Sequence, residues 1–339
     1  MKQPQPLIAL SVVFAICGCD GTRSPQASRE PTAPSFVGAM DKFKSFMVPT
    51  NNSQPRHIVL GPDANVWFTE SVRIGRVDAK GKISEFLLPD TSAGPDDITR
   101  GPDGALWFTI LAGFPDAIGR VTTSGVFSTF GTCNAQQCFS IVPQGITTGP
   151  DGNLWFTESA QNAIGRLTPS GTFTFFAIPT LGANPSGITL GPDGAIWFAE
   201  FGANQIGRID VATGAIIEFG SGSITGGPDR ITTGPDGNLW FTEPFPFDSR
   251  IGRMTTTGNV MEFQLANGAQ PRDIVTGPDG NLWFTEYGAL QLAQITPDGV
   301  VTEVQTVKGG PWGIGRGLDG TIWLTQFDGN RVGRFTLAP

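Results

Sequence analysis

The sequence predicts an all-β protein, a seven-bladed β-propeller with four antiparallel strands in each blade. The motif GPDGNLWFTE occurs unchanged at three places, starting at residues 149, 234 and 277, and four looser copies start at 61, 101, 191 and 317. Counted between their tryptophans, successive copies lie 40 to 48 residues apart, a period typical of repeat architectures. The runs between them lack a 3.6-residue apolar period, which argues against helical repeats. The tryptophans are Trp67, Trp107, Trp155, Trp197, Trp240, Trp283 and Trp323.

The third copy shows how one repeat makes one blade. Four β-prone runs, at 145–148, 154–157, 163–168 and 172–178, are long enough for short strands. The turn at 149–152 has proline second and glycine fourth, as a type I turn prefers. Most of the 46 glycines and 27 prolines fall in such turns, which separate the strands.

The two ends of the chain predict how the ring closes. The last copy ends after the run 331–336, which is only its third strand. The segment 43–49 (FKSFMVP) resembles the fourth-strand segments 83–89 and 260–265. We therefore expect the amino-terminal strand to complete the last blade, which removes the open sheet edges of an unclosed ring.

The amino-terminal segment predicts export and a lipid anchor. Lys2 precedes a short apolar run, 7–16, that ends in Ile16-Cys17-Gly18-Cys19 and resembles a bacterial lipobox with Cys19 as the lipidated residue. The alternative is an ordinary secretory signal with incidental cysteines. We expect a signal peptide at 1–19, a flexible tether at 20–40 and the propeller at 41–339. The expected location is the cell envelope or periplasm, and whether the inner or the outer membrane holds the anchor stays open.

The two remaining cysteines predict a disulfide, and the net charge limits the classes of molecule that the protein can bind. Cys133 and Cys138 flank a short polar loop, and in an exported protein a disulfide between them is the default. The net charge of −8 and pI of about 4.7 argue against nucleic acid as a partner. No basic cluster follows the anchor, so we expect membrane contact through the lipid only. We expect a monomer.

Two columns of residues meet on one face of such a propeller, because the first strand of each blade lines the central channel. The strand-end column is the last residue of each WFTE strand: Glu70, Ile110, Glu158, Glu200, Glu243, Glu286 and Gln326. The first-strand column is the pair that follows proline in each Pro-x-x-Ile segment: Arg56 and His57, Asp96 and Asp97, Gln144 and Gly145, Ser186 and Gly187, Asp229 and Arg230, Arg272 and Asp273, Trp312 and Gly313.

The two columns predict different roles. Glutamate recurs in five of the seven strand ends, which favours a part in the blade plan over a part in one active site. We expect Glu158 and Arg166 to be neighbours across a hairpin, and the tryptophans to pack between blades. The first-strand column varies from blade to blade, as a site built on a symmetric scaffold does, although an unspecialised polar rim is the alternative.

The repeat motif resembles that of the streptogramin B lyase (virginiamycin B lyase) family. The resemblance rests on P-x-x-I-x-x-G-P-D-G-x-L-W-F-T-E, the IGR that follows and a G-x-x-x-E-F strand, and it runs from about Phe43 to the end of the chain. It implies a magnesium-dependent carbon–oxygen lyase that opens a cyclic depsipeptide by elimination. The resemblance also implies two histidines, at the places of Arg272 and Trp312 here, and two glutamate metal ligands, at Gly310 and Gln326.

None of these four places keeps the family's residue. Trp312 cannot accept a proton, Gly310 offers no ligand, and Gln326 supplies a neutral amide. The chain has a single histidine, His57, and a single tyrosine, Tyr287. Apart from the carboxylates, these two side chains are the candidates for a base. The sequence therefore assigns no catalytic residue and no metal ligand.

Three hypotheses follow for the function. The first is a propeller that binds a small molecule or an envelope protein, without cofactor. The second is a divergent lyase or hydrolase with a relocated site around Asp96, Asp97, Glu243 and Glu286, which would need magnesium if it is a lyase. The third is a lactonase-type calcium propeller, whose expected cluster of Glu, Asn and Asp ligands cannot be located from the sequence. The candidate binding face is Arg56, His57, Asp96, Asp97, Asp229, Arg230, Arg272, Asp273, Glu286, Tyr287, Trp312 and Gln326.

Overall fold

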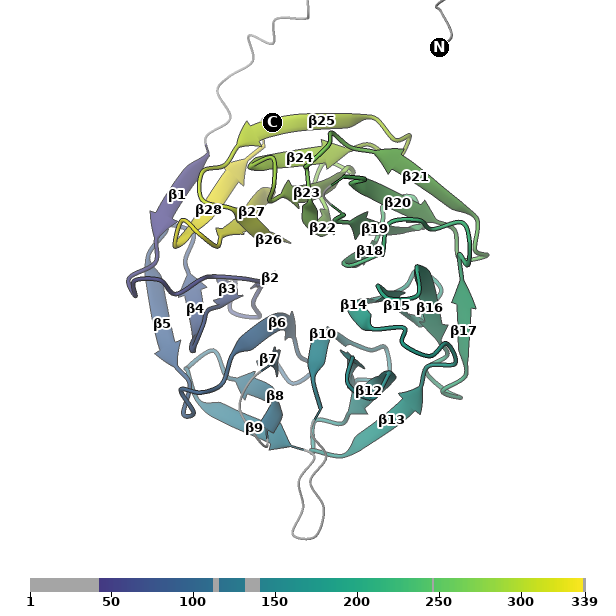
Figure 1. Ribbon diagram of the computed structural model, residues 1–339. Coiled ribbons are helices and arrows are strands. Elements are labelled where there is room, and N and C mark those ends of the chain that lie inside the picture. The colour runs from purple at the N-terminus through teal and green to yellow at the C-terminus, as the bar shows by residue number, and fades with distance from the viewer. Residues whose placement is uncertain (1–42, 112–115, 132–140, 246, 338–339) are drawn as a thin grey trace, which may run out of the picture. The chain divides into compact units, whose positions relative to one another are not determined.

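The structure is a ring of seven four-stranded antiparallel sheets around a central channel, as Figure 1 shows. It is a computed structural model that describes residues 43–111, 116–131, 141–245 and 247–337. The predicted all-β, seven-bladed propeller is therefore confirmed, and the described residues contain no helix. The signal peptide, the tether, Cys19, and the cysteine pair Cys133 and Cys138 lie outside the described residues.

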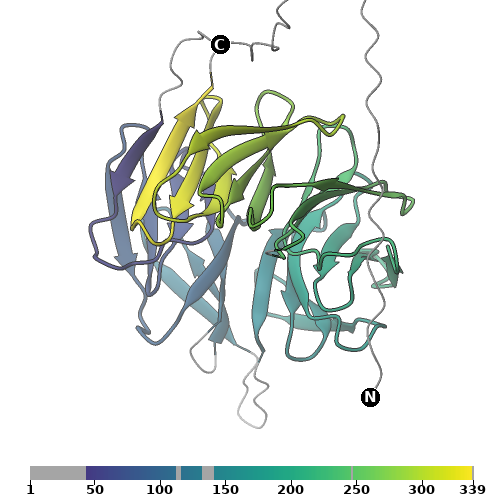
Figure 2. The same ribbon diagram turned by 45° about the horizontal axis from the view of Figure 1, so that its top comes forward.

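Each blade is a four-stranded meander that runs from the channel outward (Figures 1 and 2). The strands of the first four blades are β2 (Ile58–Leu60), β3 (Val66–Thr69), β4 (Arg73–Val77) and β5 (Ile83–Leu87); β6 (Pro95–Arg100), β7 (Leu106–Ile110), β8 (Asp116–Val121) and β9 (Phe127–Gly131); β10 (Pro143–Thr148), β11 (Leu154–Glu158), β12 (Ala163–Leu167) and β13 (Phe173–Ala177); β14 (Pro185–Leu190), β15 (Ile196–Glu200), β16 (Gln205–Ile209) and β17 (Ile216–Phe219). Those of the last three are β18 (Ile231–Thr233), β19 (Leu239–Glu243), β20 (Arg250–Met254) and β21 (Val260–Gln264); β22 (Pro271–Thr276), β23 (Leu282–Glu286), β24 (Gln291–Ile295) and β25 (Val301–Thr306); β26 (Pro311–Arg316), β27 (Thr321–Gln326) and β28 (Arg331–Thr336) with β1 (Lys44–Met47).

The last blade closes the ring with strands from both ends of the chain. Its strand order is β1-β28-β27-β26, and β1 pairs antiparallel with β28 from Lys44↔Arg334 to Met47↔Arg331. Behind this pair, the side chain of Asn330 donates to the carbonyls of Val48 and Thr50. The predicted closure by the amino-terminal strand is confirmed.

The hydrophobic core is divided into clusters between neighbouring blades. Trp67 of the first blade packs with Phe108 of the second, Trp107 with Phe156 of the third, and so on around the ring. The last step closes it, because Trp323 shares a cluster with Phe68 of the first blade. The prediction that the tryptophans pack between blades is confirmed, and the core stays continuous although each blade is thin.

The GPDG turn holds the indole and the IGR arginine together. In the second blade, Asp103 Oδ1 accepts from Trp107 Nε1 at 2.9 Å while Asp103 Oδ2 pairs with Arg120 Nε at 2.6 Å. The guanidinium of Arg120 lies 5.9 Å from the Trp107 ring centroid, a cation–π contact. The same arrangement recurs with Asp193, Trp197 and Arg208.

The predicted contact between Glu158 and Arg166 is wrong. In the β11–β12 ladder, Arg166 lies opposite Trp155, and Glu158 lies opposite Ala163. Residues 155 and 158 point to opposite faces of the strand, because side chains alternate along it. Arg166 stacks on Trp155 at 5.6 Å, whereas Glu158 accepts from the backbone N–H of Val142.

Within the described residues, the structure contains no helix long and apolar enough to cross a membrane.

Candidate functional site

The candidate site begins at a bulge in the first strand of the blades. In five blades the ladder shifts register between the proline and the isoleucine of the Pro-x-x-Ile segment, for example between Pro143 and Ile146. The two residues between them therefore leave the ladder. Where the second residue has a side chain, it meets its counterparts from other blades, as His57 meets Arg230.

The threonine of the WFTE strand fixes each bulge and ties it to the next blade. Thr69 Oγ1 accepts from the backbone N–H of His57 at 3.1 Å and donates to the carbonyl of Asp96 in the next blade at 2.6 Å. Thr109, Thr157, Thr242, Thr285 and Thr325 make the same two bonds. The fourth blade has Ala199 instead, and there Ser186 Oγ bonds to the carbonyl of Asp229 at 2.8 Å.

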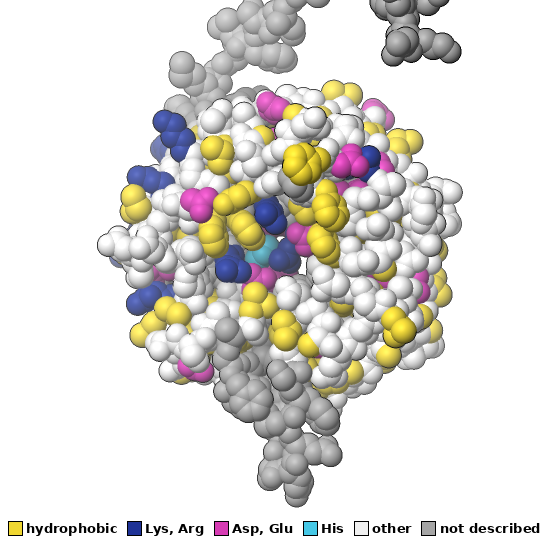
Figure 3. Space-filling view, in the orientation of Figure 1, with side chains coloured by type: hydrophobic (Ala, Val, Ile, Leu, Met, Phe, Trp, Pro, Cys, Tyr) yellow, Lys and Arg dark blue, Asp and Glu magenta, His cyan; other side chains and the backbone are white. Residues whose placement is uncertain are grey.

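Six charged or titratable side chains meet at the channel mouth and form what we call the channel cluster: Arg56, His57, Asp96, Asp97, Arg230 and Asp273. Arg230 reaches across the ring, 3.3 Å from Asp97 and 3.6 Å from Asp96. Arg56 binds Asp96 at 3.1 Å. Figure 3 shows this mixture of basic, acidic and histidine side chains at the centre of the face. Sequence analysis named all six, and the structure brings them together.

The channel cluster engages both ring nitrogens of His57. Its Nε2 lies 2.7 Å from Arg230 Nη2, and a guanidinium can only donate, so Nε2 accepts. Its Nδ1 faces Asp273 at 3.6 Å. Burial raises the pKa of Asp273, but its contact with His57 and then the charge of Arg230 outweigh this and lower it. Since His57 is only 4% exposed, the channel cluster holds it away from any ligand on the rim.

The remaining channel positions are glycines because neighbouring blades approach too closely for a side chain. A Cβ at Gly187 would lie 2.5 Å from the carbonyl of Asp229, and one at Gly313 would lie 2.8 Å from the Cα of His57. The variation in the first-strand column therefore has a steric part as well as a chemical one.

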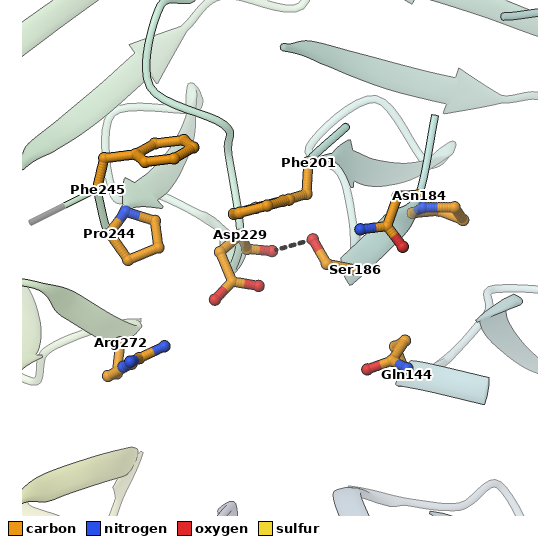
Figure 4. A pocket seen from close by; sticks show the side chains of 9 residues that line it. Gln144, Asn184, Ser186, Phe201, Asp229, Pro244, Phe245 and Arg272 are labelled. Atoms are coloured by element: carbon orange, nitrogen blue, oxygen red, sulfur yellow. Dashed lines mark hydrogen bonds between the residues drawn. The ribbon is translucent and has the colours of Figure 1, made fainter. Parts of the chain in front are cut away.

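A pocket of about 480 Å³ opens on the rim beside the channel cluster, and we call it the face pocket. Figure 4 shows Arg272 and Gln144 on opposite sides, with Asp229 between them and the rings of Phe201 and Phe245 alongside. The two phenylalanine rings stack at 5.7 Å. Asn184, Pro185, Ser186 and Pro244 complete the lining.

The guanidinium of Arg272 is held by aromatic rings rather than by carboxylates. It lies 4.6 Å from the ring centroid of Trp312 and 5.4 Å from that of Tyr287. Trp312 in turn stacks on Phe327 at 5.0 Å, and Arg56 covers the far side of Phe327 at 5.5 Å. The structure thus joins Trp312 and Tyr287, both named from the sequence, to the wall of the face pocket.

The strand-end column does not contribute to this face. Glu286 and Gln326 are 1% and 2% exposed. Burial and then the charge of Glu303, on the outer strand β25, raise the pKa of Glu286 to about 7. Gln326 accepts from Ser45 Oγ at 2.6 Å and donates to the carbonyl of Lys308. Both side chains are therefore buried inside their blades, in agreement with the structural role expected for the column.

Four blades contain a pair of glutamates that interact across the third strand, of which the inner one is buried and the outer one is half-buried or exposed. The pairs are Glu70 with Glu85, Glu200 with Glu218, Glu243 with Glu262, and Glu286 with Glu303. The glycine of IGR leaves the room, since a Cβ at Gly75 would lie 2.6 Å from Glu70 Oε1. Burial, and then the charge of the second glutamate, raise the pKa of Glu70 to about 9, and those of Glu200 and Glu243 to about 8. The inner carboxyl of these three pairs is therefore protonated at neutral pH.

Glu70→Gln is expected to raise the free energy of unfolding at pH 8 by on the order of 2 kcal/mol and to change it little at pH 5. The folded-state pKa of Glu70 lies near 9, above the ordinary value of 4.5, so the folded chain binds the extra proton. Below the pKa of the unfolded chain both states carry this proton, so it does not affect the free energy of unfolding. As the pH rises from about 4.5 toward 9, the free energy of unfolding falls, because only the folded chain still binds the proton. Urea unfolding at both pH values measures the difference.

The matched control for this prediction is Glu158→Gln. The carboxylate of Glu158 accepts from the backbone N–H groups of Val142, Ala160 and Gln161, so an amide there removes an acceptor. We expect Glu158→Gln to lower stability at pH 8. A gain from both substitutions, or from neither, would contradict the glutamate-pair explanation.

Sequence analysis missed the aromatic wall and the amides of the face pocket. Phe201, Phe245 and Asn184 lie in loops rather than in the two columns, although Gln144 and Ser186 belong to the first-strand column. A signal was present, because the residue that follows the WFTE strand is aromatic in three blades: Phe201, Tyr287 and Phe327. Among the described residues, no three His, Cys, Asp or Glu side chains are grouped so that they could hold a metal ion.

Comparison with known proteins places the chain in a family. The model of the Virginiamycin B lyase family matches residues 35–243 and 223–338. The chain belongs to the virginiamycin B lyase family. A streptogramin B lyase structure is 34% identical and superposes with a TM-score of 0.78, covering 88% of this chain and 98% of that chain. No match was found among curated proteins.

Two further structures show how far the likeness extends. A catalytically inactive virginiamycin B lyase from Staphylococcus aureus with quinupristin is 36% identical, covers 88% of this chain and 100% of that chain, and has a TM-score of 0.76. Hydrazine synthase from Kuenenia stuttgartiensis is 17% identical, covers 86% of this chain and 97% of that chain, and has a TM-score of 0.69. At that identity the second likeness concerns the fold alone. The family expectation from the repeat motif is confirmed.

Proposed function

We propose that this member of the virginiamycin B lyase family is an envelope-anchored binding protein that takes a small molecule in the face pocket and does not open streptogramin B antibiotics. The observation that carries the proposal is the face pocket itself. It holds a guanidinium, on Arg272, and a carboxylate, on Asp229, without an ion-pair partner within 4.0 Å in the described part of the chain. Paired charges serve the fold, whereas unpaired charges on a concave wall are what a ligand uses.

The residues at the family's metal positions do not fit a magnesium ion. Gly310 has no side chain, and the amide of Gln326 is engaged by Ser45 and Lys308. A hard cation prefers carboxylate and water oxygens in its coordination shell. These two positions therefore offer a magnesium ion no carboxylate ligand.

Neither the single histidine nor the single tyrosine is suited to act as the base. His57 is buried with its Nε2 facing Arg230, and Trp312 occupies the place of the family's second histidine. The hydrogen bond that Tyr287 donates to Asp328 at 3.0 Å, and then burial and the charge of Asp328, raise the pKa of the Tyr287 phenol above its ordinary value of 10.0. A base must be deprotonated near the working pH, so the phenol is a poor one.

Quinupristin incubated with the purified chain and magnesium is expected to remain intact, as followed by mass spectrometry. A lost general base costs about 10²–10⁴-fold in rate, and a lost catalytic metal removes several kcal/mol of charge stabilisation. The virginiamycin B lyase from Staphylococcus aureus, not its inactive variant, is the positive control. Membrane release of a Cys19→Ala variant tests the anchor separately.

The second candidate function, a divergent lyase with a relocated site, has one observation in its favour. The carboxylate of Asp229 is unpaired and lines the face pocket, so it is the described carboxylate best placed to act as a relocated base. Linearised quinupristin that forms at an enzyme-like rate and disappears in Asp229→Asn would overturn the binding proposal in favour of this alternative.

A further inference from the structure

We propose that the ligand of the face pocket is a small zwitterion that carries an aromatic ring, of the kind represented by an aromatic α-amino acid. This inference rests on the proposed binding function and names the class of ligand. It combines three features of one pocket: an unpaired guanidinium, an unpaired carboxylate and a stacked pair of aromatic rings.

Arg272 presents a fixed, unsatisfied edge. Its Cζ lies 4.6 Å from the ring centroid of Trp312 and 5.4 Å from that of Tyr287, and these two rings form an edge-to-face pair, 5.5 Å apart, that holds the guanidinium from one side. No Asp or Glu of the described chain lies within 4.0 Å of it, and its Nε is buried without a hydrogen-bond partner. A planar fork held in this way matches a carboxylate, which accepts two parallel N–H bonds.

Asp229 presents the opposite charge from another wall. Its backbone is fixed, because its N–H donates to the carbonyl of Thr242 and its carbonyl accepts from Gly187 and Ser186. The carboxylate has no hydrogen-bond or ion-pair partner among the described residues. Figure 4 shows it directed into the space between Arg272 and Gln144. A carboxylate so placed favours an ammonium group.

The two charges do not neutralise each other, since no ion pair within 4.0 Å joins Asp229 to Arg272. A simple anion would be attracted by Arg272 but repelled by Asp229. A simple cation would be attracted by Asp229 but repelled by Arg272. A ligand that carries both charges gains a charge-assisted hydrogen bond from each wall. The pocket therefore selects against ligands with one charge only.

The third feature is apolar. Phe201 and Phe245 stack with centroids 5.7 Å apart and an interplanar angle of 18°. The ring of Phe245 packs against Gly227, which has a φ of 59°. A Cβ at Gly227 would lie 2.8 Å from Cε2 of Phe245 and would displace this ring. Phe245 is 44% exposed, so its ring offers an open surface for another aromatic ring. The volume of about 480 Å³ is within the range of roughly 300–1,000 Å³ of small-molecule sites.

Isothermal titration with L-phenylalanine, phenylacetate, phenethylamine and glycine tests the proposal. These probes keep both charges and the ring, or lack the ammonium, the carboxylate or the ring in turn. We expect L-phenylalanine to bind at least tenfold more tightly than each of the other three. Asp229→Asn should weaken L-phenylalanine at least tenfold while phenylacetate binds no less tightly. Arg272→Gln should weaken L-phenylalanine while phenethylamine binds no less tightly.

The control variant is Asp298→Asn, in the exposed turn between β24 and β25, which should bind L-phenylalanine as the unchanged chain does. Equal affinity for all four probes, or equal loss in the control, would overturn the zwitterion proposal. If none of the four binds but a neutral sugar or a nucleotide binds and is lost in Phe245→Ala, the binding function holds and the ligand class is wrong. If no probe of any class binds, both proposals fall.

Discussion

Removal of residues 1–49 is expected to lower the free energy of unfolding by about 5 kcal/mol or more, enough to abolish stable monomer. The deletion takes away β1, which forms the outer strand of the last blade. It also removes Val48, which is fully buried, and Phe46, which stacks on Trp323 at 6.0 Å. Each such apolar side chain contributes about 1.5–3 kcal/mol when buried. The sum approaches the whole stability of an ordinary domain, about 5–15 kcal/mol.

The comparison that isolates ring closure is a deletion of residues 1–40 only, which removes the predicted signal peptide and tether. We expect that chain to unfold in urea at an unchanged midpoint and to elute as a monomer in gel filtration. The longer deletion should aggregate, because β28 is left as an open edge. A soluble, monomeric and equally stable product from the longer deletion would contradict closure by β1.

Arg230→Met is expected to cost about 3–5 kcal/mol, because it leaves buried carboxylates without their main counter-charge. Arg230 is the side chain that contacts Asp96, Asp97 and His57 at once, at 3.6, 3.3 and 2.7 Å. Burial lowers the pKa of its guanidinium, but the surrounding aspartates, Asp97 first, raise it above its ordinary value. Its charge is therefore strongly coupled to the fold.

The pH dependence of this variant has a definite sign. Without Arg230, the folded-state pKa values of the buried aspartates should rise, so the variant loses further stability as the pH increases from 4 to 8. Arg208→Met is the matched control, because Arg208 pairs with Asp193 at 2.7 Å on the outer surface and such exposed pairs contribute about 0–1 kcal/mol. Equal losses in the two variants, measured by thermal unfolding at pH 5 and 8, would show that the channel cluster is no more important than a surface pair.

The wrong prediction of a contact between Glu158 and Arg166 shows where a sequence pattern stops being informative. The recurrence of glutamate at the strand ends correctly indicated a structural role. It did not indicate the partner, because the face on which a side chain lies depends on the register of the ladder. Register places Arg166 opposite Trp155 and sends the strand-end glutamate toward the outer strand, where four blades supply a second glutamate.

In the face pocket, too, the sequence pattern indicated some of the residues and only the structure showed the others. The first-strand column contains Gln144, Ser186, Asp229 and Arg272, and the sequence singled out this column as the variable one. Its neighbours in the pocket, Phe201 and Phe245, follow the WFTE strands of two different blades. A motif cannot report that their rings stack, because the loops that carry them have no repeat to follow.

The sequence by itself determined the number of blades, the strand order within each and the closure of the ring. These features depend on short-range patterns, namely strand, turn and apolar alternation, which repeat every 40 to 48 residues and so reinforce one another. Only the tertiary structure decided which charges meet. Arg230 and His57 are 173 residues apart and touch at 2.7 Å, because closing the ring brings the first strands of distant blades around one channel. Arg272 stays unpaired for the same reason, since the ring places aromatic rings rather than carboxylates beside it.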